Sequence, residues 1–316
     1  MIPSYLKRIS TSFFSLVTVF ILTFFILELT PGNRQEFESV KHFETPFAQK
    51  PTLKSRTLGE TFKHFVASVP VFFSSHREES LTYKQDVLHV FLEAFQCSLF
   101  YWIPALLLTL LFGTFFGGAI AVTENEFLRR NLKAVFLFLF NIPTFVLALV
   151  LLFLSSILFP FQGNSVERFG PTHFQSVTQF LLPIFTYLLF SVSSLALQVE
   201  AWMTEEAQRE YSMGLRAKGF SKPYIYARHL FPNLFQLYLF SMPNIFRNFR
   251  ILSVAIEVTF RITGFGYLSY LSFMNRDTPL LFFMVIAISA MDLILHLFFE
   301  GLTLILLNRK RPYQYA

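Results

Sequence analysis

Six long apolar segments constrain this chain more than any other feature of its sequence. A membrane-spanning helix needs about 20 mostly apolar residues, because each residue rises about 1.5 Å across a hydrocarbon core of about 30 Å. The segments that meet this length are 10–29, 96–122, 134–159, 178–199, 234–258 and 280–307. We therefore predict an all-α, polytopic membrane protein with about six transmembrane helices.

The composition excludes an ordinary soluble domain. Hydrophobic residues make up 53% of the chain and charged residues only 15%, whereas soluble domains carry about 25% charged residues. Folded in water, the chain would expose far more apolar surface than a soluble monomer tolerates. The single cysteine, Cys97, allows no internal disulfide and no multi-cysteine metal site.

The basic residues indicate how the chain crosses the membrane. Six spans place both termini on one side, and basic residues are enriched in loops on the cytoplasmic side of membranes. The short loops on the opposite side carry only Arg168, Arg261 and Arg276. We therefore expect cytoplasmic termini, because that side holds Lys7, Arg8, Arg129, Arg130, Lys133, Arg209, Arg216, Lys218, Lys222, Arg228, Arg309, Lys310 and Arg311.

Three regions follow from these spans. Residues 1–29 are expected to form a cytoplasmic tail and the first spanning helix, and residues 30–95 an external soluble segment. Residues 96–316 are expected to form the core transmembrane domain, including a cytoplasmic loop at 200–233. The segment 62–75 is too short to span and contains Lys63 and His64, so we predict a surface or interfacial helix there.

The polar loop 200–233 is predicted to fold as helix, turn and helix. Gly219 suits the left-handed position that ends a helix, Ser221 can cap the next helix, and Pro223 is tolerated in a first turn. In the first half of the loop, apolar side chains recur every four residues and form one stripe, at Met203, Ala207, Tyr211 and Leu215. The loop is therefore expected to be a short helical hairpin.

Motifs along the whole chain carry a family resemblance. The loop holds Glu210-Tyr211, Arg216-Ala217-Lys218-Gly219 and His229-Leu230-Phe231-Pro232-Asn233. An external turn is expected at the end of the fifth span, with Glu257, Phe260, Gly264-Phe265-Gly266 and Arg276-Asp277-Thr278-Pro279. The front of the chain holds Tyr5-Leu6-Lys7-Arg8 and Leu29-Thr30-Pro31-Gly32. Taken in order, this set resembles ABC importer permeases of the dipeptide, oligopeptide and nickel branch. A Gly-Asp-Leu-Gly-x-Ser signature of that branch is not evident, the nearest stretch being 71–80.

The resemblance implies a type I ABC importer permease fold in a bacterial cytoplasmic (inner) membrane. It implies that the chain forms a pathway for di- or oligopeptides by alternating access, with nickel or another small solute as the alternative cargo. The implied partners are a second, similar permease subunit, two cytoplasmic ATPase subunits and an external solute-binding protein. The loop around Gly219 would then be the element that couples to the ATPases.

The chain itself is not expected to bind ATP. Gly214 and Gly219 have the spacing of a phosphate-binding loop, but Phe220 stands where that loop requires lysine. No apolar strand precedes the glycines, so the strand-to-helix turn that presents backbone N–H groups to phosphates is also missing. ATP and Mg²⁺ are therefore expected on the partner subunits, and this chain is expected to be a transport subunit and not an enzyme.

Charged residues within the spans suggest two further hypotheses, because such charges are expensive in lipid and are usually functional. They are Arg247 and Arg250 in the fifth span and Asp292 and Glu300 in the sixth. Arg247 and Asp292 lie at similar depth and could form an interhelical ion pair. Alternatively, Arg247 and Arg250, three residues apart, could line the pathway and meet carboxylates of a passing peptide.

Other classes of function have weaker support in the sequence. The histidines show no metal-ligand spacing, such as two on one helix face a turn apart, so no metal site is expected. A secondary transporter usually shows internal repeats, and none is apparent. An intramembrane enzyme needs a reactive group at one depth, and neither Arg247 nor Asp292 is a nucleophile.

Overall fold

The computed structural model describes residues 80, 82–158, 177–275 and 277–308, together with scattered positions between 10 and 63. Most of the predicted first span, of the external segment and of the predicted surface helix at 62–75 lies outside the described residues. Two compact parts are distinguished: Met1–Phe95 with Tyr267–Leu297, called the first part, and Gln96–Gly266 with Phe298–Ala316, called the second part.

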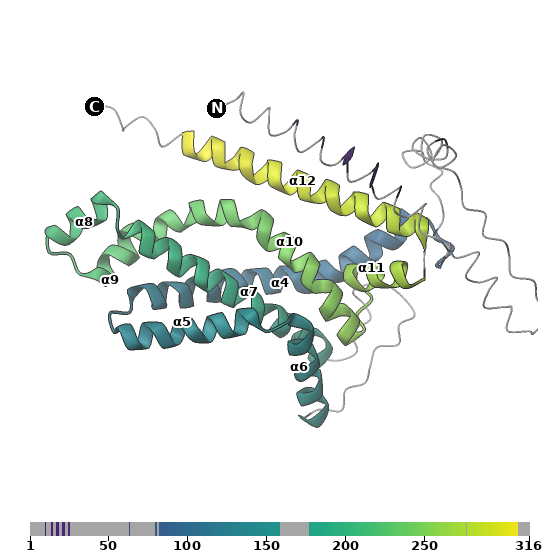
Figure 1. Ribbon diagram of the computed structural model, residues 1–316, viewed down its shortest axis with the longest axis horizontal. Helices are drawn as coiled ribbons and strands as arrows, with labels where there is room; N and C mark the ends of the chain where they lie inside the picture. The colour runs from purple at the N-terminus through teal and green to yellow at the C-terminus, as the bar shows by residue number, and fades with distance from the viewer. Residues whose placement is uncertain are drawn as a thin grey trace, which may run out of the picture. The chain divides into compact units, whose positions relative to one another are not determined.

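Every regular element of the described residues is a helix, apart from one isolated bridge residue, which agrees with the predicted all-α class. Figure 1 shows these helices along the chain. They are α4 (Val87–Val122), α5 (Glu126–Asn141), α6 (Thr144–Leu158), α7 (Val177–Glu206), α8 (Glu210–Ala217), α9 (Lys222–Ile225), the π-helix η2 (Tyr226–Leu230), the 3-10 turn η3 (Phe231–Asn233), α10 (Leu234–Phe260), α11 (Phe265–Met274) and α12 (Thr278–Asn308).

The helices are long enough for several membrane crossings. Among the described residues, three helices are long and apolar enough to span a membrane; they lie within α4, α7 and α12. The number rises to as many as five if each of two bent pairs counts as one span. The bent pairs are α5 with α6, and the segment Lys222–Phe260 with α11. The predicted first span, 10–29, stays a prediction because most of it lies outside the described residues.

The predicted span 134–159 is not one continuous helix, although the two helices found there can together count as one broken span. The chain forms α5 and α6 there, and the two helices are bent by 93°, as Figure 1 shows. Pro143 explains the break, because proline disfavours helical backbone at the preceding residue. Ile142 accordingly adopts extended dihedral angles, φ −69° and ψ 126°.

Small residues bring α4 and α7 into close contact. A Cβ atom added to Gly113 would lie 2.8 Å from Cβ of Leu195, and one added to Gly117 would lie 2.6 Å from the carbonyl oxygen of Ala196. Neither position has room for a side chain, so the two backbones pack directly against each other. Helix α10 in turn packs against α6 and α7, and α5 packs along α7.

A buried aromatic group joins α4, α7 and α10 in the second part. Trp102 donates a hydrogen bond from Nε1 to the hydroxyl of Tyr187 over 3.0 Å. The Tyr187 hydroxyl donates to the backbone oxygen of Phe249 over 3.3 Å, and the two rings stack with centroids 5.0 Å apart. These bonds satisfy the polar atoms of large buried rings, which would otherwise pay a desolvation cost.

Candidate functional site

The hairpin, defined here as Glu210–Asn233, has the predicted turn geometry. Helix α8 ends before Gly219, whose φ of +85° lies in the left-handed region. Ser221 occupies the N-cap position of α9, and Pro223 lies in that helix's first turn, although the Ser221 side chain makes no capping hydrogen bond. The predicted helix, turn and helix is therefore confirmed, whereas the side-chain cap is not.

The predicted apolar stripe from Met203 to Leu215 does not lie on one helix, so that prediction is wrong. Helix α7 ends at Glu206 and α8 begins at Glu210. The intervening turn is held by the buried Glu206 carboxylate, which accepts a hydrogen bond from the Tyr211 hydroxyl over 2.9 Å and lies 2.8 Å from Nε of Arg209. Met203 and Ala207 are buried, but Tyr211 is exposed, so the four residues do not form one buried face.

Several aromatic and apolar side chains of the hairpin are exposed. Phe220 and Tyr224 stack in nearly parallel planes with ring centroids 5.1 Å apart. Exposed large hydrophobic residues on a surface mark an interaction site when they are grouped together. Phe220 and Tyr224 form such a pair; the other exposed large hydrophobic residues of the hairpin are Tyr211, Met213 and Phe231.

The motif residues of the hairpin are mostly accessible. Exposed residues that were singled out from the sequence are Glu210, Arg216, Ala217, Lys218, Gly219, Ser221 and Pro232. Partial burial of Tyr211 and the hydrogen bond that it donates to Glu206 raise the pKa of the Tyr211 hydroxyl to about 12. The hairpin thus presents basic side chains and aromatic rings on one short, folded element.

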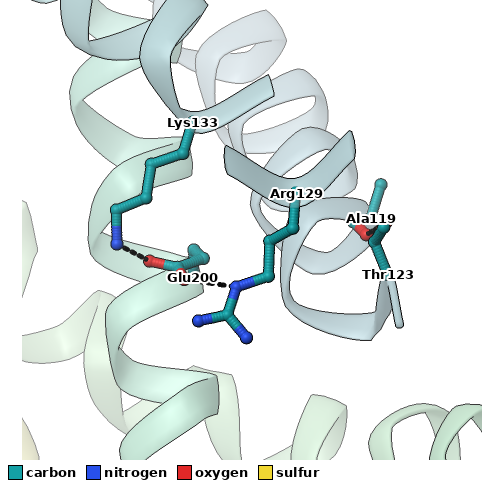
Figure 2. Close-up of polar contacts among 5 residues, drawn as sticks. All are labelled: Ala119, Thr123, Arg129, Lys133 and Glu200. Atoms are coloured by element: carbon teal, nitrogen blue, oxygen red, sulfur yellow. Dashed lines mark hydrogen bonds and ion pairs between the residues drawn. The ribbon is translucent and has the colours of Figure 1, made fainter. Parts of the chain in front are cut away.

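A buried carboxylate ties the base of the hairpin to α5. Glu200 lies on α7, six residues before the helix ends, and its side chain is only 2% exposed. Lys133 donates from Nζ to Oε2 of Glu200 over 2.7 Å, and Nε of Arg129 lies 3.8 Å from Oε1. Figure 2 shows both basic side chains reaching from α5 toward Glu200. We call these three residues the Glu200 cluster.

The local sequence of α5 explains this arrangement. Asn125 caps the helix, accepting a hydrogen bond from the backbone N–H of Leu128 over 3.2 Å. Arg129 and Lys133 are four residues apart and so lie on one helix face. Arg129 also acts beyond the cluster. The pKa of Lys222 in the hairpin is lowered, first by the partial burial of Lys222 itself and then by the positive charge of Arg129. The start of α5, the end of α7 and the hairpin therefore share one electrostatic environment.

Sequence reasoning missed the Glu200 cluster. The sequence marks Arg129 and Lys133 only as topology signals, and Glu200 only as the first residue of a polar loop. One signal was available: Glu200 is an acid placed at the end of an apolar run. Its partners are 67 residues and more away in the chain, so no local pattern could identify them.

The predicted turn after α10 is tightly packed around Glu257, which is fully buried. Ser98 donates to Oε1 of Glu257 over 2.7 Å, and the Tyr101 hydroxyl donates to the same oxygen. A Cβ atom on Gly264 would lie 2.5 Å from Oε2 of Glu257, and one on Gly266 would collide with the backbone of Ser253. The two glycines are therefore required by packing in the second part of the chain.

Asp277 organises a separate turn in the first part. It is fully buried, and its Oδ2 accepts hydrogen bonds from the Ser80 hydroxyl over 2.5 Å and from the Thr82 N–H over 2.9 Å. Its Oδ1 accepts from the N–H of Leu280 over 3.3 Å, at the start of α12. Pro279 lies in the first turn of α12, where proline is tolerated, whereas Arg276 lies outside the described residues.

Ser80 is a second residue that sequence reasoning missed. It closes the stretch 71–80, in which a branch signature was sought without success. Its partner Asp277 is 197 residues away, so only the folded chain reveals that Ser80 and Asp277 belong to one turn.

A family model of the binding-protein-dependent transport system inner membrane component matches residues 110–312. These residues include the hairpin, the Glu200 cluster, α10 and the turn around Glu257. The chain belongs to this family of inner membrane permeases. This finding confirms the predicted type I ABC importer permease fold and agrees with a multi-pass inner membrane protein.

Curated relatives of the permease are similar over different lengths. It is 29% identical to the inner membrane ABC transporter permease protein YejB of Escherichia coli O157:H7, over 45% of this chain and 42% of the relative. It is 25% identical to the peptidoglycan transport system permease protein YejB of Agrobacterium fabrum, over 63% of this chain and 57% of the relative. For these two relatives, the permease spans about half of their length.

A third relative is matched from end to end. The permease is 24% identical to the dipeptide transport system permease protein DppB of Lactococcus lactis subsp. cremoris, over 98% of this chain and 100% of the relative. The similarity therefore extends beyond the residues that the family model matches.

The intramembrane charges of the permease have different surroundings. Arg250 is buried and Arg247 is exposed, although both lie on α10. Asp292 and Glu300 on α12 are half-buried. Arg247 and Asp292 belong to different parts of the chain, so their pairing stays a prediction. Within the described residues, no three His, Cys, Asp or Glu side chains gather as a metal-binding group.

Proposed function

We propose that this permease is the membrane-spanning subunit of an ABC importer and carries peptides by alternating access. The observation that carries the proposal is the hairpin, which presents a stacked aromatic pair, Phe220 and Tyr224, on an exposed and folded element. A transport protein of this family needs such a surface because the energy source is a separate polypeptide. The family match over residues 110–312 supports the same conclusion.

The proposed partners follow from this role. A second, similar permease subunit would complete the pathway, two ATPase subunits would bind the hairpins, and an external solute-binding protein would deliver the cargo. ATP and Mg²⁺ would be held by the ATPase subunits, because the residue after Gly219 is Phe220 and not the lysine of a phosphate-binding loop. The basic residues that flank the spans support cytoplasmic termini in a bacterial inner membrane.

Alternating access requires that a movement of the hairpin is transmitted to the membrane-spanning helices. The Glu200 cluster supports such a link, because it joins α7, which leads directly into the hairpin, to α5. We propose that ATP-driven closure of the ATPase pair moves the hairpin and that α7 and α5 follow as one unit. A ligand or partner can drive this change only by binding one of the two states more tightly.

Peptides are the favoured cargo because of the relatives' names. The Lactococcus relative is named as a dipeptide permease, and the match covers nearly the whole of both chains. A second candidate cargo is a peptide-bearing fragment of peptidoglycan, which the name of the Agrobacterium relative favours. Competition between unlabelled peptidoglycan fragments and a labelled tripeptide for uptake would separate the two.

Uptake and partner capture together test this function. Cells that produce the complete importer should accumulate labelled Ala-Ala-Ala. Cells that produce the importer with residues 205–221 of this chain deleted should not. The double variant Phe220→Ala/Tyr224→Ala should reduce the co-purified ATPase by about tenfold or more, because buried aromatic anchors dominate binding energies at interfaces. Phe138→Ala is the control, since Phe138 is an exposed aromatic residue on α5, outside the hairpin.

The orientation has its own test. Cys97 is buried, so a cysteine introduced by Tyr315→Cys would be the accessible thiol. A membrane-impermeant maleimide should label it in inside-out vesicles and not in intact cells. Labelling in intact cells would overturn the proposed orientation, and normal uptake without residues 205–221 would overturn the proposed function.

A further inference from the structure

One face of α10 is exposed along the length of the helix. Phe240 and Ile251 are 61% and 64% exposed, and Asn244 and Arg247 between them are also exposed. The spacing of four, three and four residues places all of them on one side of an α-helix. The residues between them, such as Ile245 and Phe249, are buried against the rest of the second part.

Asn244 and Arg247 lie well inside α10, which together with α11 can count as one bent span. Arg247 is 13 residues from the start of α10 at Leu234, or about 20 Å along a helix that rises about 1.5 Å per residue. An exposed guanidinium at that depth is unfavourable against lipid, and such residues nearly always face a water-filled cavity or protein. Within the described residues of the second part, no ion pair joins Arg247 to a carboxylate.

Helix α7 adds a third polar side chain beside this face. Gln198 is exposed although it lies in an apolar span. Its Nε2 donates to the Ser194 hydroxyl over 3.1 Å, and its Oε1 accepts a longer hydrogen bond, 3.4 Å, from the Ser241 hydroxyl on α10. Gln198 is eight residues before the end of α7 at Glu206, or about 12 Å along the helix. Both helices thus present polar groups within the membrane.

We propose that Gln198, Asn244 and Arg247 form a recognition site for the C-terminal carboxylate and neighbouring peptide groups of the cargo. The planar guanidinium of Arg247 can hold a carboxylate with two parallel hydrogen bonds. The side-chain amides of Asn244 and Gln198 each offer donors and an acceptor, which suit the N–H and C=O groups of a peptide backbone. Phe240 and Ile251 supply apolar contact on either side. This site rests on the proposed function in peptide transport.

Charge complementarity favours a peptide over lipid or another protein surface as the occupant. A peptide in transit carries a carboxylate that must leave water, which costs free energy of desolvation. A site that pairs the carboxylate with a positive charge lowers this cost. A contact with the second permease subunit would also remove Arg247 from lipid. That alternative predicts loss of assembly, and not altered discrimination between cargoes, when Arg247 is replaced.

The test compares two probes that differ only at the carboxylate. Uptake of labelled Ala-Ala-Ala and of labelled Ala-Ala-Ala amide is measured in cells with the complete importer. The affinity of the solute-binding protein for each probe is measured separately, and the ratio of the two uptake rates is corrected for the ratio of the two affinities. The original chain should favour the free acid by about tenfold, because a charge-assisted hydrogen bond is about twice as strong as a neutral one. Arg247→Gln should reduce the ratio to near one, and Arg247→Lys should leave an intermediate ratio, since lysine keeps the charge without the fork.

Arg130→Gln is the matched control, since it removes the same charge from an exposed position on α5, and it should leave the ratio unchanged. An unchanged ratio in Arg247→Gln, with normal membrane levels, would overturn the site and leave the proposed function standing. Loss of the second permease subunit on purification of that variant would also overturn it, in favour of a subunit interface. Failure of the original chain to accumulate either probe would instead count against the proposed peptide transport.

Discussion

The cytoplasmic hairpin and the turn around Glu257 are both rich in motif residues, yet they are built in opposite ways. In the hairpin, Gly214 and Gly219 have no atoms within 4 Å of an added Cβ, and the aromatic rings are exposed. At the other turn, Gly264 and Gly266 have no space for a Cβ atom, and Glu257 is buried. The hairpin therefore leaves its glycines and rings open to solvent, whereas the Glu257 turn is shaped by contacts within its own chain.

Glycine replacement should separate the two regions most sharply. Gly266→Ala should lower the free energy of unfolding by about 2 to 4 kcal/mol, because overpacking against backbone cannot relax as a flexible side chain can. Gly214→Ala should change it by less than about 1 kcal/mol, and in the stabilising direction, because alanine is the better helix former. Thermal unfolding of both variants in detergent measures this contrast. Equal losses would show that the packing difference does not govern stability.

Loss of the Glu200 carboxylate should have the next largest effect. Glu200→Ala leaves Arg129 and Lys133 facing each other without their partner, and we expect a cost of about 2 kcal/mol, below the range for a fully buried pair because both cations are half-exposed. In a Lys133→Ala background the same replacement should cost about 1 kcal/mol less. Unfolding of the single and double variants measures the coupling, and strict additivity would contradict it.

Gly219→Ala should have a smaller effect that is confined to the hairpin. Its φ of +85° disfavours any residue with a Cβ, so we expect a cost of about 1 kcal/mol. Hydrogen exchange should become faster in α8 and α9 and stay unchanged in α4 and α7. Gly219→Asn should cost less, because asparagine tolerates the left-handed region better. Faster exchange throughout the spans would show that the turn is not a local feature.

The smallest expected effect is the pH dependence that Tyr211 adds. Its pKa is raised from 10.0 to about 12 in the folded chain, so the folded state holds the proton more tightly than the unfolded state. The resulting stabilisation is complete below pH 10 and is lost as pH rises toward 12. Tyr211→Phe should therefore make the fall in unfolding temperature between pH 10 and 12 shallower. An unchanged slope would mean that the Tyr211 to Glu206 hydrogen bond does not persist.

Local patterns in the sequence predicted the features that depend on neighbouring residues. The apolar runs predicted the helical segments at α4, α7, α10 and α12, because the thickness of a membrane sets the length of a span. Gly219 and Pro223 predicted the hairpin turn, because each has a backbone preference of its own. The break at Pro143 was available by the same logic and was overlooked in favour of continuous hydropathy.

The sequence alone determined the family and the general plan of the permease, because the lengths of the apolar segments, the distribution of charges and the order of the motifs are properties of the sequence itself. Only the tertiary structure showed that Glu200 meets Arg129 and Lys133 and that Asp277 meets Ser80. It alone distinguished the exposed Arg247 from the buried Arg250. The physical reason is that pairing and burial depend on which helices pack together, and contacts between residues 67 to 197 positions apart leave no periodic signal in the chain.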